Sequence, residues 1–301
     1  EPQGTGHVVD LTCGCGADAV AFVRAGLRVT AVERDAVTAV LARANLRGAS
    51  GGDASVLCGD AETLAPGLLA GGAAVFCDPS RRTAAGRTWR VEDFSPSWGF
   101  VTSLLDGGRL ACAKLGPGLP HSLIPDAVEA EWVSVGGDLV EAALWAGPGT
   151  TPGRRRAVVD DHELTRDAAL APPPVGRVGE YVYEPDAAVI RAGLVPAVAE
   201  AVGAWRLHDG VAYLTASGLV QTPFAEAFAV DEVLPYSEKG LRAWVRERGI
   251  GALEIKKRGV DADPAALRRR LRPAGPNSAT LILTPTASGA QALVARRLAA
   301  G

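Results

Sequence analysis

Three carboxylates follow short apolar runs near the start of this 301-residue chain, with a glycine turn behind the first. Asp10, Glu33 and Asp60 each lie at or just after such a run, and Gly14 and Gly16 follow the first of them. If the runs are parallel strands, their carboxyl ends meet at one edge of a sheet. We therefore predict a pocket at this edge with the size and shape of a nucleoside.

The glycine turn is suited to a ligand that approaches the backbone closely. Gly14 and Gly16 carry no Cβ and can adopt left-handed conformations. A helix that begins near Ala17 would present its free N–H groups to the same ligand. The glycine spacing alone also fits a dinucleotide site, so it does not define the cofactor.

The acids discriminate better than the glycines. Glu33 could accept both hydroxyls of a ribose, but dinucleotide enzymes use an acid there too. Asp10 lies just before the turn, where a carboxylate would repel a pyrophosphate but suit an α-amino group, directly or through water. Asp60 could accept the amino group of an adenine, with the N–H of Ala61 facing the ring.

Alternating strand and helix patterns must position these residues. We predict strands near residues 8–12, 28–33, 54–59, 73–78, 108–114, 129–135 and 139–146. Helices are predicted near 17–25, 35–47, 61–70, 97–106 and 121–127, and beyond this region near 187–203. This order is typical of an α/β fold with a doubly wound, seven-stranded, Rossmann-like sheet. A tight turn at residues 136–138 predicts that the last two strands pair antiparallel.

Over residues 8–146 the chain resembles the class I S-adenosylmethionine-dependent methyltransferases. Residues 10–16 resemble the first motif of that family, Glu33 the second and residues 59–61 the third. Thr12 replaces the usual first glycine and could add a hydroxyl contact to the carboxylate of the cofactor. The resemblance implies S-adenosyl-L-methionine as cofactor, bound by Asp10, Thr12, Cys13, Gly14, Gly16, Glu33, Arg34, Asp60, Ala61 and Asp78.

The fourth predicted strand leads into a motif that resembles nucleic-acid methyltransferases. It reads Asp78-Pro79-Ser80-Arg81-Arg82. Asp78 could orient an amine or accept its proton, and Pro79 would fix the direction of the chain. Enzymes that modify amino groups carry a proline and an aromatic ring where Ser80 and Arg81 stand, so stacking from this motif is missing. Arg81 and Arg82 could instead clamp a phosphate, stack on a base, or form a loop salt bridge. The candidate catalytic residues are Asp78, Pro79, Arg81 and Arg82.

Composition shifts divide the rest of the chain. A glycine- and proline-rich cluster at residues 147–153 indicates a boundary. The resulting prediction is a methyltransferase domain (1–149), a ferredoxin-like α+β domain (150–235) and a basic THUMP-like domain (236–301). The last two assignments come from a second resemblance, to a bacterial methyltransferase family, which rests on the Asp-Pro-Ser-Arg-Arg motif and on residues 180–186 and 250–259. Because the chain contains no methionine, we expect a native segment, helical by that likeness, to precede it.

Charge is distributed unevenly. Residues 236–301 contain 13 Lys and Arg against 5 Asp and Glu, a net charge of +8, whereas residues 1–235 have a net charge of −11. A basic segment of this kind is typical of a surface that meets a polyanion, although a solvated helix face would have the same composition. THUMP modules bind RNA, commonly tRNA, and the predicted RNA-binding residues are Lys256, Lys257, Arg258, Arg268, Arg269, Arg270 and Arg272.

Other classes of protein receive little support from the sequence. No apolar run approaches the roughly 18 residues of a membrane span, and no signal peptide opens the chain, so a cytoplasmic protein is expected. The five cysteines are interpreted as small buried hydrophobes, neither disulfides nor metal ligands.

The leading hypothesis is therefore a methyltransferase that modifies a base nitrogen of RNA, either tRNA or rRNA. Three alternatives stay open. One is a small-molecule or protein methyltransferase, and another is a non-catalytic RNA-binding protein on the same scaffold. The third is a nicotinamide dehydrogenase, disfavoured by Asp10 and by the lack of a proton-relay pair.

Overall fold

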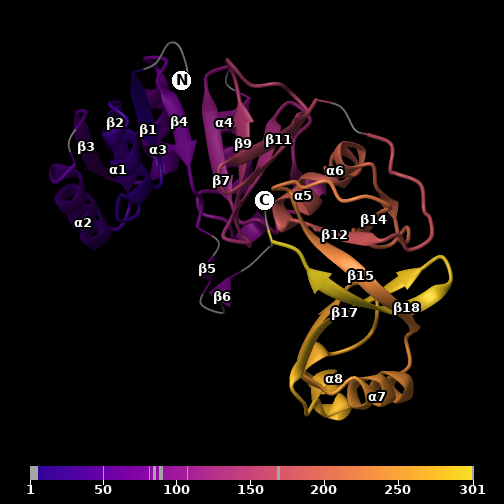
Figure 1. The fold of residues 1–301 in the computed structure, drawn as a ribbon. Coiled ribbons are helices and arrows are strands. Elements are labelled where there is room, and N and C mark those ends of the chain that lie inside the picture. Colours follow the sequence, from indigo (N-terminus) through magenta and orange to yellow (C-terminus); the bar gives the residue numbers. More distant parts are fainter. Residues whose placement is uncertain are drawn as a thin grey trace. The chain divides into compact units, whose positions relative to one another are not determined.

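A computed structural model describes residues 6–49, 51–80, 82–83, 86–87, 91–106, 108–167 and 170–299. Side chains are described for these residues except 82–83 and 86–87. The chain divides into two compact units: the first comprises residues 1–135 and 139–156, and the second residues 136–138 and 157–301. Figure 1 labels the elements along the chain.

The first unit contains the predicted sheet. Its strands are β1 (His7–Asp10), β2 (Arg28–Glu33), β3 (Ala54–Cys58), β4 (Ala74–Cys77), β7 (Ala111–Leu115), β8 (Glu129–Val135) and β9 (Asp138–Ala146). They lie in the order β8-β9-β7-β4-β1-β2-β3. The pairs among β3, β2, β1, β4 and β7 are parallel, whereas β9 runs antiparallel to β7. This confirms the doubly wound α/β sheet with its antiparallel last strand.

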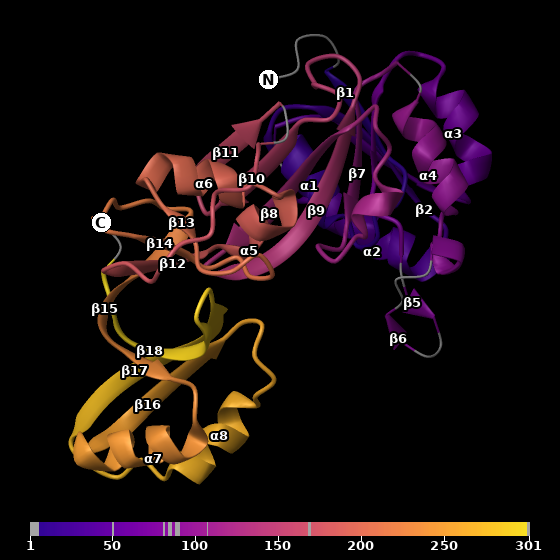
Figure 2. The same ribbon diagram turned by 90° about the vertical axis from the view of Figure 1, so that its right-hand side faces the viewer.

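Helices cover both faces of this sheet. They are α1 (Ala17–Arg24), α2 (Ala36–Arg47), α3 (Ala61–Leu69) and α4 (Trp98–Leu105), with 3₁₀ turns η1 (Val91–Asp93) and η2 (His121–Leu123). Ala19 and Val23 of α1 pack with Ala42 and Leu46 of α2 over the buried side chains of β2. Helices α3 and α4 lie side by side on the opposite face (Figure 2). The helix predicted near 121–127 is thus only a single 3₁₀ turn.

A short hairpin, β5 (Arg82–Thr83) and β6 (Gly86–Arg87), follows β4 and was not predicted. Strands β10 (Arg155–Val159) and β11 (His162–Arg166) follow β9 beyond the predicted boundary at residue 149. They extend the sheet beside β8, so it has nine strands, two more than predicted. The division between the two units falls within β10, after Arg156.

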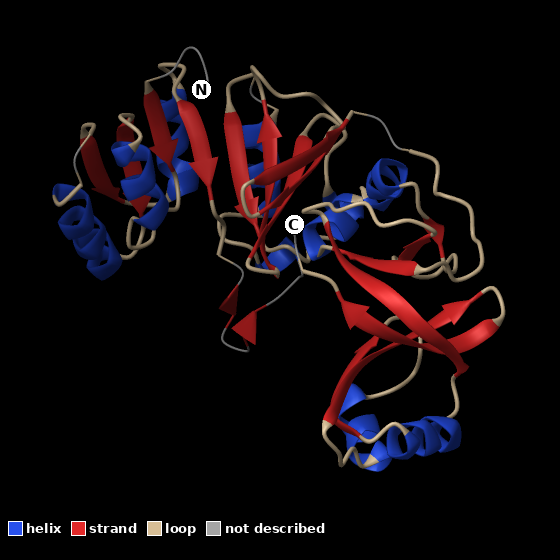
Figure 3. Ribbon diagram, viewed as in Figure 1, coloured by secondary structure: helices blue, strands red, loops and turns tan. Residues whose placement is uncertain are grey.

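The second unit is built on one seven-stranded sheet. Its elements are β12 (Tyr181–Pro185), α5 (Ala187–Ala192), α6 (Val195–Val202), β13 (Trp205–Arg206), β14 (Leu214–Ala216), β15 (Ala225–Pro235), α7 (Glu238–Glu247), β16 (Ile250–Lys257), α8 (Pro264–Leu271), β17 (Asn277–Thr286) and β18 (Gly289–Arg297). The strand order is β13-β14-β12-β15-β18-β17-β16. Figure 3 draws the strands of both units as red arrows. The predicted helix 187–203 is two helices, because Gly193 ends α5 in a left-handed conformation with φ of 75°.

Side chains of this sheet alternate between two apolar cores. Leu281 and Leu283 of β17 pack with α7 and α8, whereas Ile282 faces the other side with Phe228 and Tyr213. This period of two is the expected pattern for a strand that is covered on both faces. Strand β15 pairs with β12 on one edge and β18 on the other, so the predicted division at residue 235 falls within a continuous sheet. The predicted separation into a ferredoxin-like and a THUMP-like domain stays a prediction.

Among the described residues, no helix has the length and apolar character that a membrane crossing requires.

Candidate functional site

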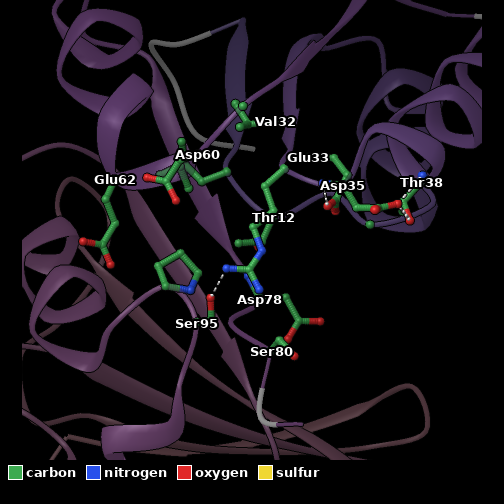
Figure 4. Close-up of a pocket in the computed structure, with 16 residues that line it drawn as sticks. Thr12, Val32, Glu33, Asp35, Thr38, Asp60, Glu62, Asp78, Ser80 and Ser95 are labelled. Atoms are coloured by element: carbon green, nitrogen blue, oxygen red, sulfur yellow. Dashed lines mark hydrogen bonds between the residues drawn. The ribbon is translucent and has the colours of Figure 1, made fainter. Parts of the chain in front are cut away.

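A cavity of about 420 Å³ opens at the carboxyl ends of β1, β2, β3 and β4. Small-molecule pockets typically have volumes of this order. Figure 4 shows its walls, which are formed by residues of all four predicted motifs and of the loop before α4. The lining residues are Leu11, Thr12, Gly14, Val32, Glu33, Arg34, Asp35, Thr38, Gly59, Asp60, Ala61, Glu62, Asp78, Ser80, Ser95 and Pro96.

The two glycines of the turn have different functions. Gly14 lines the pocket with φ of 53°, and a Cβ added there would meet no protein atom within 4 Å. It therefore leaves space for a ligand. Gly16 is the left-handed N-cap of α1 with φ of 88°, and a Cβ there would lie 3.6 Å from Ala42 of α2. Gly16 thus shapes the start of the helix and lies outside the pocket lining.

Asp10 is completely buried beneath this turn. Its Oδ1 accepts the N–H of Thr12 at 3.1 Å, while its Oδ2 is buried without a hydrogen-bond partner among the described atoms. Burial raises the pKa of Asp10 to about 7. Asp10 does not line the cavity, so its carboxyl group is not placed for direct contact with a cofactor there.

Glu33 and Asp60 do face the cavity, and each also orders its own loop. Glu33 Oε1 accepts the N–H of Asp35 at 2.8 Å, and Asp35 caps the N-terminus of α2. Asp60 caps α3 by accepting the N–H of Thr63 at 3.1 Å through Oδ1. Each acid is therefore held in place by the backbone that follows it.

The wall opposite the acids was missed by the sequence analysis. It comes from the loop before α4, where Ser95 pairs with Ser80 through two backbone hydrogen bonds of 2.8 and 3.1 Å. Arg34 reaches across to this loop and donates to Ser95 Oγ at 3.0 Å, the dashed line beside Ser95 in Figure 4. Glu62 Oε1 accepts the N–H of Ser97 at 2.8 Å. These contacts attach the loop to the carboxyl ends of β2 and β4 and to the start of α3.

Asp78 lies at the end of β4 and lines the cavity as predicted, next to buried Pro79. Its N–H donates to Thr12 Oγ1 at 2.6 Å. Lys114 at the end of β7 brings its Nζ to 3.3 Å from Asp78 Oδ2 and 2.6 Å from Asp18 Oδ2. Arg81, predicted to be catalytic, lies outside the described residues, and so does the side chain of Arg82.

Of the ten predicted cofactor residues, seven line the cavity: Thr12, Gly14, Glu33, Arg34, Asp60, Ala61 and Asp78. Asp10, Cys13 and Gly16 do not. Cys13 is buried, and burial raises the pKa of its thiol to about 12. The remaining cysteines are not all buried as expected, because Cys15 and Cys58 are exposed, but all five are free thiols.

The predicted RNA-binding residues fall into two groups in the second unit. Lys256 and Arg258 are half-buried and bind Glu184 at 2.6 and 3.2 Å, and Lys256 also binds Glu226 at 2.9 Å. These two cations are engaged in the interior of the sheet, so we leave them out of the RNA-binding set. The exposed members are Lys257, Arg268, Arg269, Arg270 and Arg272, of which Arg270 pairs with Glu238 at 2.9 Å.

The donor set of the cavity fits S-adenosyl-L-methionine. A carboxylate at the end of β2 suits ribose hydroxyls, and the loop of Asp60 and Ala61 suits an adenine. The space above Gly14 accommodates a ligand close to the backbone, and the buried carboxyl of Asp10 would favour a cationic group above it. Among the described residues, no group of three or more metal-ligating side chains is present. Fold and site together define a class I methyltransferase.

Comparisons with known proteins agree. An uncharacterized S-adenosylmethionine-dependent methyltransferase of Mycobacterium tuberculosis, found in two strains, is 34% identical over 292 residues, which cover 94% of this chain and 79% of the relative. The chain belongs to the S-adenosylmethionine-dependent methyltransferases. A crystal structure from Porphyromonas gingivalis W83, described as a methyltransferase, superposes with a TM-score of 0.80 at 25% identity, covering 98% of this chain and 77% of that one. The THUMP domain-like family matches residues 225–297.

Proposed function

We propose that this methyltransferase acts on RNA, either tRNA or rRNA, and transfers its methyl group to a base nitrogen. The proposal rests on the combination of Asp78 in the cofactor cavity with a THUMP-like segment that exposes a basic surface. Bound S-adenosyl-L-methionine would supply an electrophilic methyl group on a cationic sulfonium. Everything else in the reaction must come from the chain and the acceptor.

The cofactor would be held by the lining residues described above. Glu33 would accept the ribose hydroxyls, the loop of Asp60 and Ala61 would contact the adenine, and Gly14 would admit the ligand close to the backbone. Arg34 lies across the cavity with its guanidinium on Ser95. These side chains hold the cofactor on the glycine turn and leave the β4 end for the acceptor.

Asp78 would orient the acceptor at that end. An exocyclic or ring N–H of a base can donate to the Asp78 carboxylate, which aims the nitrogen lone pair and takes up the proton as the N–C bond forms and the S–C bond breaks. S-adenosylhomocysteine and a methylated base are then the products. Lys114 Nζ lies 3.3 Å from Asp78 Oδ2, so a positive charge faces this carboxylate.

The second unit would bind the RNA backbone. Lys257, Arg268, Arg269 and Arg272 are exposed in or beside the THUMP-like segment. Arginines on a surface of this kind give affinity and position along the backbone but little choice of sequence. Recognition of the target base would then fall to the groups around Asp78.

RNA binding is tested with charge reversal. We expect Arg268→Glu combined with Arg269→Glu to weaken binding of unmodified tRNA and rRNA transcripts by about tenfold or more at 50 mM salt, and to reduce the salt slope by roughly one unit per lost phosphate contact. Filter binding between 50 and 200 mM salt measures both. The matched control reverses two exposed arginines of the first unit, Arg24 and Arg47, and should bind like wild type.

Catalysis is tested with labelled cofactor and RNA from cells that lack the gene, followed by nucleoside mass spectrometry. One methylated base nucleoside is expected with wild type and about 100-fold less with Asp78→Asn. Glu33→Ala should weaken S-adenosylhomocysteine binding by about tenfold in calorimetry, with exposed Glu247→Ala as control. Cofactor binding without labelled RNA would instead indicate a small-molecule or protein acceptor.

A further inference from the structure

Asp78 is held at two separate points by residues from different strands. Its backbone N–H donates to Thr12 Oγ1 at 2.6 Å, and Thr12 lies 66 residues earlier, after β1. Its carboxylate Oδ2 lies 3.3 Å from Nζ of Lys114, near the end of β7. Thr12 and Asp78 both line the cavity in Figure 4. The position of the candidate catalytic carboxylate therefore depends on contacts to both neighbouring strands.

The N–H and the hydroxyl of Thr12 are both engaged within the protein. Its N–H donates to Asp10 Oδ1 at 3.1 Å, its Oγ1 accepts from Asp78, and its hydroxyl donates to Cys77 Sγ at 3.9 Å. A β-branched side chain also has few rotamers, so the hydroxyl is fixed in direction. These contacts place the Thr12 hydroxyl to serve Asp78 rather than the carboxylate of the cofactor.

Lys114 is anchored in a similar way. Its Nζ binds Asp18 Oδ2 at 2.6 Å, on the first turn of α1, and lies 5.7 Å from the ring centroid of Phe76. Burial lowers the pKa of Lys114, but its bonds to Asp18 and Asp78 outweigh burial and leave that pKa above its ordinary value. The ammonium group therefore stays charged and fixed next to Asp78.

We propose that Thr12 and Lys114 are positioning residues for methyl transfer, Thr12 through the backbone of Asp78 and Lys114 through its carboxylate. Neither residue would bind the cofactor or the acceptor through these groups. This inference rests on the proposed function in one respect, the role of Asp78 toward the acceptor. An in-line displacement is sensitive to misplacement of about 1 Å, which can cost roughly 100-fold in rate.

The first experiment compares Thr12→Val with Thr12→Ser. Valine keeps the shape but removes the hydroxyl, so kcat for RNA methylation should fall by about tenfold or more, while the Kd of S-adenosylhomocysteine changes less than about twofold. Serine restores the acceptor and should recover most of kcat. Thr102→Val is the matched control, since the Thr102 hydroxyl donates to Gly99 within α4. Weaker S-adenosylhomocysteine binding at unchanged kcat would overturn the proposal and return Thr12 to the cofactor.

A second readout needs no methyl acceptor, so it separates failure of this inference from failure of the RNA proposal. Hydrogen exchange of the Asp78 amide, followed by NMR, should accelerate by about tenfold in Thr12→Val and stay slow in Thr12→Ser. Equal exchange in wild type and Thr12→Val would refute the positioning contact, whether or not RNA is the substrate.

The Lys114 contact is tested by separating kcat from cofactor binding. In Lys114→Met the kcat for RNA methylation should fall by about tenfold or more, because the Asp78 carboxylate loses its contact at 3.3 Å, while the Kd of S-adenosylhomocysteine changes less than about twofold. Lys114→Arg should restore most of kcat. An unchanged kcat in Lys114→Met, with only a lower melting temperature, would show that Lys114 is structural and would contradict this part of the proposal.

Discussion

At the scale of single residues, Asp10 is the group with the most unusual environment. Its carboxyl is buried beneath the glycine turn, one oxygen lacks a partner among the described atoms, and burial raises its pKa to about 7. Burial favours the neutral form of this carboxyl over the ionised form, so the folded protein is more stable when Asp10 is protonated. Its ionised form becomes favourable when a cation lies nearby.

The first prediction concerns the pH dependence of folding in the free protein. The folded pKa of Asp10, about 7, exceeds the ordinary value of 3.8, so the folded state binds the proton more tightly. Its stabilising contribution is complete below about pH 4 and is lost as pH rises to about 7, by at most about 1.4 kcal/mol per pH unit. Urea unfolding from pH 4.5 to 7.5 should show this decline in wild type and not in Asp10→Asn. The exposed variant Asp106→Asn should follow wild type, and parallel curves for all three would contradict the assignment.

At the scale of elements, aspartate N-cap residues begin helices in both units. Asp263 accepts the N–H of Ala266 at 2.8 Å and precedes Pro264 at the first turn of α8. The helix bears Arg268 and Arg269, which belong to the exposed set proposed to bind RNA. Its stability therefore affects how firmly that surface is presented.

The second prediction follows from this cap. Asp263→Ala should lower the melting temperature by a few degrees, because the first turn loses its side-chain acceptor. The backbone hydrogen bond to Ala266 lowers the pKa of Asp263, so its contribution exists at neutral pH and disappears as the carboxylate is protonated. Melting curves at pH 7 and pH 3 measure the difference, with exposed Asp261→Ala as control. An equal difference at both pH values would rule out the ionised cap.

At the scale of the whole molecule, the second unit is one sheet that spans the predicted boundary at residue 235. Strand β15 pairs with β12 and with β18 over most of its length. Ion pairs also join residues on the two sides of this boundary. Glu184 of β12 binds Lys256 and Arg258, and Glu226 of β15 binds Lys256. Half-buried cations that lost these carboxylates would be left poorly compensated.

The third prediction is therefore that residues 236–301 do not fold alone. Without β15, the long strand β18 would expose an unpaired edge, and Lys256 would lack both of its acids. Residues 157–301, which follow the division between units, should fold. Circular dichroism and NMR dispersion of the two fragments distinguish the cases. A folded 236–301 fragment would instead support the predicted boundary at residue 235.

Local sequence patterns were sufficient to predict the strands that form the cavity, but not the limits of every helix. Apolar runs ending in Asp10, Glu33, Asp60 and Asp78 predicted β1 to β4, because a buried parallel strand is nearly continuous in hydrophobicity. The carboxyl ends of such strands share one edge, so the cavity and most of its lining followed. Helices were predicted less well where a glycine interrupts them, as Gly193 does between α5 and α6.

The amino-acid sequence by itself thus determined the sheet, the place of the cofactor cavity and the class of enzyme, because all three depend on local periodicity and short motifs. Only the tertiary structure decided which polar groups meet. Thr12 binds Asp78, Lys114 binds Asp18 and Lys256 binds Glu184, although the partners are separated by 66, 96 and 72 residues in the sequence. Such contacts depend on the crossing of distant strands and helices, and no pattern along the chain records which side chains a fold brings within 3 Å.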